Sequence, residues 1–381
     1  MPIVTIASVV CFWALNLAMV LSLACTLTWL LYNRFNEIPT RITIENQYEP
    51  VQNLPHPAIT ICSPNQITAS GLKHLNKTLV DGNLTINLEG TIPKLLGFYT
   101  ILKNANITLL AHLQSLLDDN RYDAPEVMGA LPQKCDNFLK LCYLERRKYP
   151  KCNKLFRPII TAYGICCSFN SFYEFKEKRN VPINNFKPFM IRGSEFHDGL
   201  TVVVDSDPEN SVPHTVLYAG AIKVLNNNNV MYSDWTEFPV DHESILVEPG
   251  TETYHLIHAT YTYCSDDVKV LPSWSRKCYF ADEQHLPYFK KYRHSDCDLV
   301  CLVEAVEKSC HCLIFTVPNL HMTAACNITS IPCIIKVKKN ANIWMRSAAC
   351  NCPRDCESRQ YKVDISTGNL NALPYIPNNP L

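Results

Sequence analysis

The stretch that decides the fold opens with RHSDCDLVCLVEAVEKSCHC (293–312) and closes with ACNCPRDC (349–356). From Cys264 to Cys356 the chain carries eleven of its 19 cysteines. Cys297 and Cys301 are four residues apart within an apolar pattern of helical period, so both sulfurs lie on one helix face about 6 Å apart. Cys350 and Cys352 are two apart, and on a strand they share a face at about 6.6 Å.

The two spacings match, which predicts pairing between the two segments. If the strand runs antiparallel to the helix, the bridges are Cys297 to Cys352 and Cys301 to Cys350. Further cysteines extend this ladder: Cys310 and Cys312 form another close pair, Cys326 and Cys333 can close small loops back onto them, and Cys278 and Cys356 clamp the two ends. The segment is predicted to be a disulfide-linked helical hairpin.

Closely spaced cysteines also serve in metal sites and as catalytic thiols. Cys-x-Cys pairs beside His311 could bind zinc, but zinc sites usually have Cys-x2-Cys or Cys-x4-Cys spacing and four ligands. A catalytic thiol would need a His or Asn partner, and no local motif identifies one. We therefore predict disulfides, with no catalytic residue, metal or cofactor, and a protein that is not an enzyme.

The amino terminus predicts a membrane helix. Residues 1–33 contain no Asp, Glu, Lys, Arg or His, and this apolar run is long enough to cross a bilayer. Trp29 and Tyr32 lie near one end, where aromatic rings favour the headgroup level, and Arg34 follows. A cleaved signal peptide is the alternative, but it would have a basic leading region and a shorter apolar core.

The rest of the chain, residues 34–381, is predicted to be extracellular at the plasma membrane. Seventeen cysteines follow the helix, and an oxidising compartment suits them. Four glycosylation sequons also indicate an extracellular position for this part of the chain: Asn76, Asn83, Asn106 and Asn327. The formal net charge of zero gives no electrostatic footprint for nucleic acid.

Between the helix and the ladder the patterns are mostly those of strands. Ile59 and Ile61 alternate in a short strand, and residues 199–205, 218–225 and 245–264 are β-rich, with a turn at Pro249 and Gly250. Residues 226–229 are predicted to be a loop. A leucine stripe between residues 109 and 117 predicts a helix. The fold class is therefore an α+β membrane protein with a disulfide-rich ectodomain.

Several motifs together resemble the degenerin/epithelial sodium channel family, most closely its arthropod pickpocket branch. They are HPAITICSPNQ (56–66), GICCSFN with its doubled cysteine (164–170), GLTVVVD (199–205), RKCYFADEQHLPYFKKYRHSDCDLVC (276–301) and CNCPRDCESRQY (350–361). Their order and spacing cover roughly residues 5 to 366, and the combination is far more specific than any single motif.

The resemblance implies a subunit of a trimeric, amiloride-sensitive, voltage-independent sodium channel, gated by an extracellular or mechanical stimulus. The implied ectodomain is hand-like, with a β-rich palm and ball and a helical thumb at residues 278–356. Homologous subunits, sodium ions and membrane lipid are the implied partners.

The resemblance also implies specific bridges. These are Cys62–Cys166, Cys142–Cys152, Cys278–Cys356, Cys297–Cys352, Cys301–Cys350, Cys310–Cys333 and Cys312–Cys326. Cys135–Cys167 is added as a bridge specific to the branch. Cys264 is then unpaired, and we interpret it as an inert buried thiol rather than a bridge between subunits.

Two departures from the family pattern shape the expected function. No His-Gly motif precedes the first helix, and the polar, Pro-rich residues up to Leu381 cannot form a second membrane helix. We expect a truncated subunit without the C-terminal palm strand and pore helix, which does not conduct alone. The alternative is a single-span cell-surface protein that binds a ligand, or a regulatory or dominant-negative partner.

Acidic residues near the ladder suggest one further hypothesis. Asp266, Asp267, Asp282 and Glu283 could form a proton-sensing carboxyl pair, because crowded carboxylates raise each other's pKa. A solvated acidic surface is the interpretation that we favour.

Overall fold

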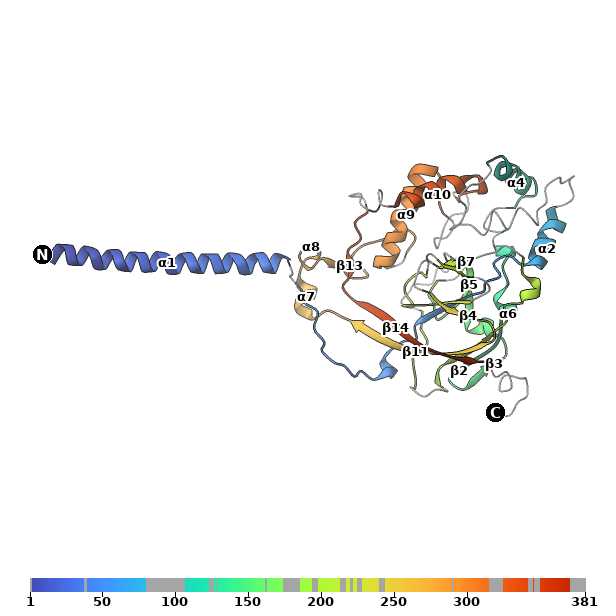
Figure 1. Ribbon diagram of the computed structural model, residues 1–381, viewed down its shortest axis with the longest axis horizontal. Coiled ribbons are helices and arrows are strands. Elements are labelled where there is room, and N and C mark those ends of the chain that lie inside the picture. The colour runs from blue at the N-terminus through green and yellow to red at the C-terminus, as the bar shows by residue number, and fades with distance from the viewer. Residues whose placement is uncertain are drawn as a thin grey trace.

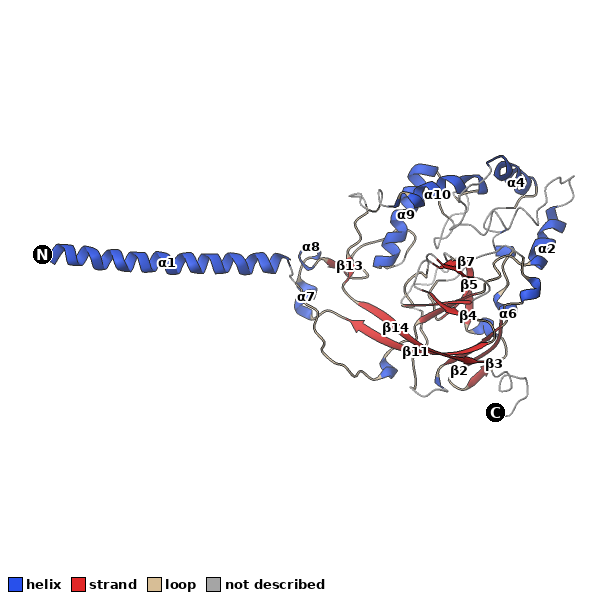
Figure 2. Ribbon diagram, viewed as in Figure 1, coloured by secondary structure: helices blue, strands red, loops and turns tan. Residues whose placement is uncertain are grey.

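The structure is a computed structural model that combines one long helix with a mixed α/β body (Figure 1). It describes residues 2–37, 40–79, 107–122, 127, 129–161, 163–173, 186–193, 198–212, 217–219, 222–224, 228–239, 244–289, 291–314, 325–341, 345 and 350–370. Helix α1 (Pro2–Glu37) projects away from the body. Within the body, the longer helices gather along one side of the strands (Figure 2).

Helix α1 has the length and composition of a membrane span. The apolar segment Val10–Glu37 has 28 residues, so it is about 42 Å long and exceeds the roughly 30 Å of a bilayer core. None of that segment is buried against the body. Its apolar side chains are therefore free to face lipid. The helix continues past residue 33, where the sequence pattern ended it, to Glu37.

A five-stranded antiparallel sheet forms the centre of the body. Its strand order is β10-β9-β1-β5-β4. The strands are β1 (Ala58–Cys62), β4 (Phe156–Thr161), β5 (Gly164–Phe169), β9 (Asn228–Ser233) and β10 (Ser244–Val247). All five residues of β1 are buried, because β5 and β9 flank it and other elements cover both faces. The hydroxyl groups of Thr60 and Ser168 satisfy each other inside the sheet at 2.8 Å.

The two adjacent cysteines of β5 form disulfides on opposite faces of this sheet. Successive residues of a strand point to opposite faces, so Cys166 and Cys167 diverge. Cys166 bridges to Cys62 of β1 on the face that packs towards helix α9, whereas Cys167 bridges to Cys135 on the opposite face. One Cys-Cys dipeptide therefore serves both halves of the core.

The described residues also form four smaller sheets. They are β3-β2-β6, β7-β8 and β11-β14, all antiparallel, and the parallel pair β12-β13. Their strands are β2 (Leu139–Leu144), β3 (Arg147–Tyr149), β6 (Leu200–Val204), β7 (Leu217–Ala219), β8 (Ile222–Val224), β11 (Thr251–Thr262), β12 (Cys278–Tyr279), β13 (Arg354–Asp355) and β14 (Ser358–Asn369). β11 and β14 pair along their full lengths as a long ribbon.

The helices form two packed groups. Leu110, Leu113 and Leu117 of α4 pack with α2, and Ile328 and Ile331 join this apolar cluster. The second group joins α9 to α10 through Val306, Ile334 and Val337. The helices are α2 (Ala69–Leu79), α4 (Ile107–Asp119), α6 (Cys135–Phe138), α7 (Asp266–Val270), α8 (Ser273–Arg276), α9 (His294–Cys310) and α10 (Ile331–Lys339), with 3-10 turns at Val51–Asn53, Cys152–Lys154, Pro208–Asn210 and Ile328–Ser330.

Sixteen of the 19 cysteines form disulfides. The bridges are Cys62–Cys166, Cys135–Cys167, Cys142–Cys152, Cys278–Cys356, Cys297–Cys352, Cys301–Cys350, Cys310–Cys333 and Cys312–Cys326. These are the pairs given in the sequence analysis. Cys11, Cys25 and Cys264 are free. We call Cys297–Cys352 the outer rung and Cys301–Cys350 the inner rung.

Two local expectations from the sequence are wrong. The segment with Cys350 and Cys352 is not a strand, since β13 begins only at Arg354. The two rungs therefore hold an irregular segment against α9, with Cα–Cα distances of 5.7 and 5.5 Å. Asn228 and Asn229 are buried strand residues of β9 rather than loop residues. The β-rich pattern at residues 218–225 is confirmed by the paired strands β7 and β8.

The two rungs are expected to stabilise the fold redundantly. Replacing both cysteines of one rung with Ala should lower the free energy of unfolding by about 2 kcal/mol, because the other rung still closes nearly the same loop in the unfolded chain. Removing both rungs should cost more than the sum of the two single removals. Urea unfolding of the full chain in detergent measures these differences.

The Cys142–Cys152 bridge provides the matched control, because it closes a separate loop. Its removal should add independently to the removal of one rung. Additive effects of the two rungs would contradict the redundancy.

Candidate functional site

A cluster of charged side chains joins the start of α9 to the strands. We call it the junction cluster. Its members are Asp234, Thr236, Glu237, Arg293, Asp296, Asp355 and Arg359. They come from the turn after β9, from the first turn of α9, and from β13 and β14, so the cluster connects three segments that are far apart in the sequence.

Asp234 is the acceptor at the centre of the cluster. Its carboxylate is 1% exposed, and Oδ1 accepts hydrogen bonds from the backbone N–H and hydroxyl of Thr236, both at 2.9 Å. Oδ2 accepts from Arg359 Nη1 of β14 at 2.9 Å. The Arg359 guanidinium also lies over the ring of Tyr261 in β11, 5.0 Å from its centroid. Asp234 thus ties the central sheet to the β11-β14 ribbon.

Arg293 makes the corresponding connection from α9. Its Nε and Nη2 donate to the Thr236 hydroxyl at 3.0 and 2.7 Å, and its Nη1 donates to the Glu357 carbonyl at 3.0 Å. The guanidinium is buried, and it donates to oxygen atoms of two other segments. Moving the guanidinium away would leave a buried charge and its acceptors without hydrogen bonds, which is costly. These contacts therefore fix the position of the start of α9.

Two carboxylates complete the first turn of α9. Asp355 of β13 accepts from the backbone N–H of His294 at 3.2 Å, which satisfies an otherwise unpaired donor at the helix start. Asp296 is 1% exposed; its Oδ1 accepts from the backbone N–H of Phe238 at 3.2 Å, and its Oδ2 has no hydrogen-bond partner. A buried carboxyl oxygen without a partner favours the protonated acid.

Burial raises the pKa of three acids in the cluster. The pKa of Glu237 rises to about 7, because burial is reinforced by the charge of Asp234, which outweighs the opposing Arg293. The pKa of Asp296 is well above its usual range, mainly through burial, with Glu237 adding to the effect. Burial also raises the pKa of Asp355, against the opposing charge of Arg293. The cluster therefore holds fewer negative charges near neutral pH than its carboxyl groups suggest.

A second contact joins the body to the end of α1. Lys277 Nζ donates to the backbone carbonyl of Glu37, the last residue of α1, at 3.1 Å. Lys277 lies between α8 and β12 in the left-handed region, with φ of 60°. Its neighbour Cys278 is bridged to Cys356, next to β14. The turn that holds Lys277 is thus linked to α1 by a hydrogen bond and to the start of β14 by a disulfide.

The acidic residues singled out in the sequence do not form carboxyl pairs. Asp266, Asp267, Asp282 and Glu283 are exposed, and those with ion pairs contact bases: Asp266 with Lys269 and Glu283 with Arg276. Burial acts to raise the pKa of Glu283, but hydrogen bonds from Arg276 and the Phe280 N–H lower it overall. The solvated-surface interpretation fits these contacts.

The sulfur atoms near the ladder are close together but bonded. Groups such as Cys297, Cys301 and Cys352 lie within 4.8 Å of one another. In these bridges each sulfur is already bonded to a second sulfur, whereas zinc binds the thiolate form of cysteine. The bridged cysteines are therefore structural links and not thiolate ligands.

Sequence reasoning did not single out the junction cluster. One signal was available, because Asp296 lies four residues before Val300 and so shares the buried face of α9. A charged residue on an apolar helix face requires a partner or a proton. The residues that contact it, on the turn after β9, carry no such signal.

Comparison with known proteins decides the family of the chain. The model of the amiloride-sensitive sodium channel family matches residues 5–377. The chain belongs to this family.

Individual family members fit the same assignment. Sodium channel protein Nach of Drosophila melanogaster is 27% identical over 93% of this chain and 67% of its own length. Pickpocket protein 28 of the same species is 24% identical over 95% of this chain and 61% of its own length. The mouse bile acid-sensitive ion channel is 22% identical over 92% of this chain and 65% of its own length. The chain is thus a degenerin/epithelial sodium channel subunit of the pickpocket type, and it spans 61–67% of the length of these relatives.

The sequons of this channel subunit stay predictions. Asn83 and Asn106 lie outside the described residues. Asn76 is partly exposed in α2. Asn327 is exposed, and its Oδ1 accepts from the Thr329 hydroxyl at 2.6 Å and from the Ser330 N–H at 3.1 Å, which leaves Nδ2 as the atom to which a glycan would attach.

Glu237→Gln is expected to stabilise this channel subunit increasingly as the pH rises from 5 to 8. With its pKa raised to about 7 from 4.5, folded Glu237 keeps a proton that the unfolded chain loses, so the wild type loses stability across that window. The gain of the variant should reach at most about 3 kcal/mol. Thermal unfolding of the full chain in detergent at several pH values checks this.

Glu248→Gln is the control, since Glu248 is an exposed carboxyl outside the junction cluster. A difference between Glu237→Gln and the wild type that stays constant from pH 5 to 8 would rule out a protonated Glu237.

Proposed function

We propose that the chain is a subunit of a trimeric, sodium-selective, amiloride-sensitive and voltage-independent channel at the plasma membrane. The observation that carries the proposal is the family match over residues 5–377. Homologous subunits are the partners, and sodium ions pass through the complete channel. The eight disulfides support an extracellular position for the body, because such bridges persist in oxidising surroundings.

In this proposal the parts of the chain correspond to the parts of a hand-like subunit. Residues 1–33 are the first membrane helix, and residues 34–381 are extracellular. The thumb is residues 278–356, where α9 and α10 carry the two rungs and the bridges that follow them. The β11-β14 ribbon belongs to the palm.

The contacts support a route from the thumb to the membrane helix. A stimulus that displaces α9 acts on the junction cluster, because Arg293 and Asp296 belong to the start of that helix. The bridge Cys278–Cys356 then connects β13 to the turn of α7 and α8, which lies beside the end of α1 (Figure 1). The Lys277 to Glu37 hydrogen bond completes the route.

Residues 1–381 expressed alone are expected to carry no current. Among the described residues one helix is long and apolar enough to cross a membrane, and in the proposed channel the pore is lined by a second membrane helix, which the family resemblance implies. The test records whole-cell current, with and without amiloride, from cells expressing the chain alone or with a complete pickpocket-type subunit. Surface biotinylation first confirms delivery.

Altered current on co-expression, with none from the chain alone, is the expected result. Surface delivery without any effect on the partner's current would refute the proposed assembly with homologous subunits.

Lys277→Asn tests the proposed route. Asn tolerates the left-handed backbone of this position but cannot reach the Glu37 carbonyl with an ammonium group. We expect a several-fold change in stimulated current at equal surface level in the co-expression assay. The control is Lys269→Asn, which removes a nearby ammonium group that pairs with Asp266 instead. Equal effects of the two variants would contradict a specific role of the contact with α1.

A further inference from the structure

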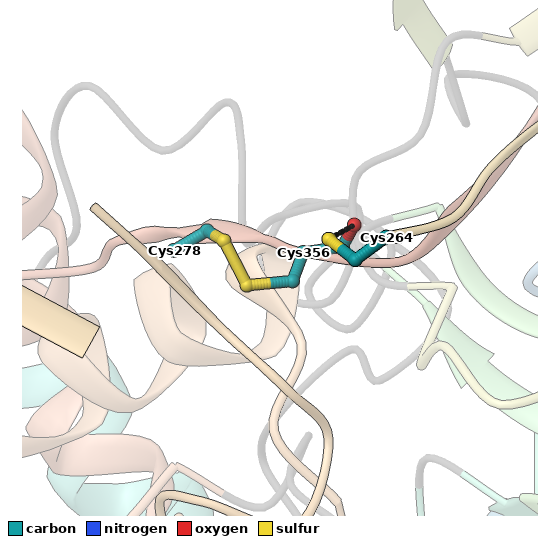
Figure 3. Close-up of side chains that lie close together, drawn as sticks. All are labelled: Cys264, Cys278 and Cys356. Atoms are coloured by element: carbon teal, nitrogen blue, oxygen red, sulfur yellow. Dashed lines mark hydrogen bonds between the residues drawn. A yellow bond between two sulfur atoms is a disulfide. The ribbon is translucent and has the colours of Figure 1, made fainter. Parts of the chain in front are cut away.

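Three sulfur atoms meet at the base of the thumb-like segment (Figure 3). Cys264 lies two residues after the end of β11, Cys278 begins β12, and Cys356 follows β13. Cys278 and Cys356 are bridged, whereas Cys264 is a free, partly buried thiol. The three Sγ atoms all lie within 4.8 Å of one another. A thiol is thus held next to a disulfide that it does not belong to.

A hydrogen bond positions the Cys264 thiol. Its Sγ donates to the backbone carbonyl of Cys356 at 3.3 Å. Figure 3 shows the thiol on the Cys356 side of the bridge rather than the Cys278 side. The last paired residue of β11 is Thr262, so Cys264 lies beyond the strand ladder and its side chain can move towards the bridge without breaking a strand hydrogen bond. Cys356 is therefore the sulfur within easiest reach.

We propose that Cys264 is the nucleophile of an intramolecular thiol–disulfide exchange that moves the bridge from Cys278–Cys356 to Cys264–Cys356. Cys264 loses its proton to solvent, and the thiolate attacks Sγ of Cys356. A new sulfur–sulfur bond forms as the bond between Cys356 and Cys278 breaks. Cys278 leaves as a thiolate and takes up a proton. One thiol and one disulfide are present before and after, so no external oxidant or reductant is required.

The charges around Cys264 set the pH dependence of this step. Burial raises the pKa of the thiol and Glu357 adds to the effect, while Arg276 of α8 and Lys269 of α7 oppose it. Because the thiolate is the attacking species, the exchange is slow at neutral pH and accelerates as the pH rises. A transient approach of Arg276 or Lys269 would have the same accelerating effect as a higher pH.

The exchange would release one side of the turn beside α1. Cys278 follows Lys277 directly, and the bridge to Cys356 is the covalent tie between that turn and the start of β14. After the exchange Cys356 is bonded instead to the end of β11, which already pairs with β14. The effect on gating rests on the proposed function, whereas the sulfur chemistry does not.

Disulfide mapping of the wild type tests the proposal without recording any current. The full chain, purified in detergent, is held at pH 7, 8 and 9 for increasing times, acidified, alkylated, digested without reduction and analysed by mass spectrometry. We expect a Cys264–Cys356 peptide and alkylated Cys278 to accumulate, with an initial rate up to about tenfold higher for each pH unit. Unchanged Cys278–Cys356 with alkylated Cys264 at all times and pH values would overturn the proposal.

A trapping variant gives an independent readout. Cys278→Ser removes the leaving sulfur, and we expect the disulfide-forming oxidants of the secretory pathway to join Cys264 and Cys356 in most molecules that reach the cell surface. Cys142→Ser is the matched control, because it leaves Cys152 without its partner, and alkylated Cys152 is expected there. Alkylated Cys264 and Cys356 in surface-delivered Cys278→Ser would refute the exchange. If that variant fails to reach the surface, the wild-type mapping decides.

Discussion

The arrangement depends first on the attachment of an irregular segment to a helix by two covalent rungs. Residues 350–353 form no strand and take part in no backbone ladder, so Cys350 and Cys352 hold this segment in place through α9. Helical period places Cys297 and Cys301 on one face, and the irregular segment places one cysteine within bonding distance of each. β13 and β14 follow this segment directly in the chain. By holding the segment against α9, the rungs therefore also fix where the β11-β14 ribbon lies relative to the helices.

The charged side chains of the junction cluster hold the start of α9 against the strands as well. Arg293 and Arg359 approach the turn after β9 from α9 and from β14, and they meet at Thr236 and Asp234. Burying this many charges is costly unless each is hydrogen-bonded or neutralised. Asp234 is satisfied by hydrogen bonds, while Asp296 and Glu237 have raised pKa values that favour the neutral acid. The joint thus combines a covalent constraint with one that depends on protonation.

The sequence predicted those parts of the fold that depend on a pattern among neighbouring residues, such as an apolar run or a helical period. The apolar run of α1, the period of α9, the short strand at Ile59 and the turn at Gly250 each depend on neighbouring residues, and the structure has them. Asn228 and Asn229 look like loop residues locally but are buried in β9, because pairing with β1 and β10 overrides propensity. The junction cluster could not be predicted, since its members meet only after α9, β9 and β14 are assembled.

The Cys278–Cys356 bridge has less backbone structure around it than the Cys62–Cys166 bridge of the central sheet. Cys62–Cys166 spans two central strands that hydrogen bonds hold in register, and the two rungs brace each other along α9. Cys278–Cys356 instead joins the two-residue strands β12 and β13, which form one short parallel pair. Exchanging this bridge would disturb few hydrogen bonds, and the free thiol of Cys264 lies beside it. A rearrangement that would be costly in the central sheet is less costly at this point, where the body meets the membrane helix.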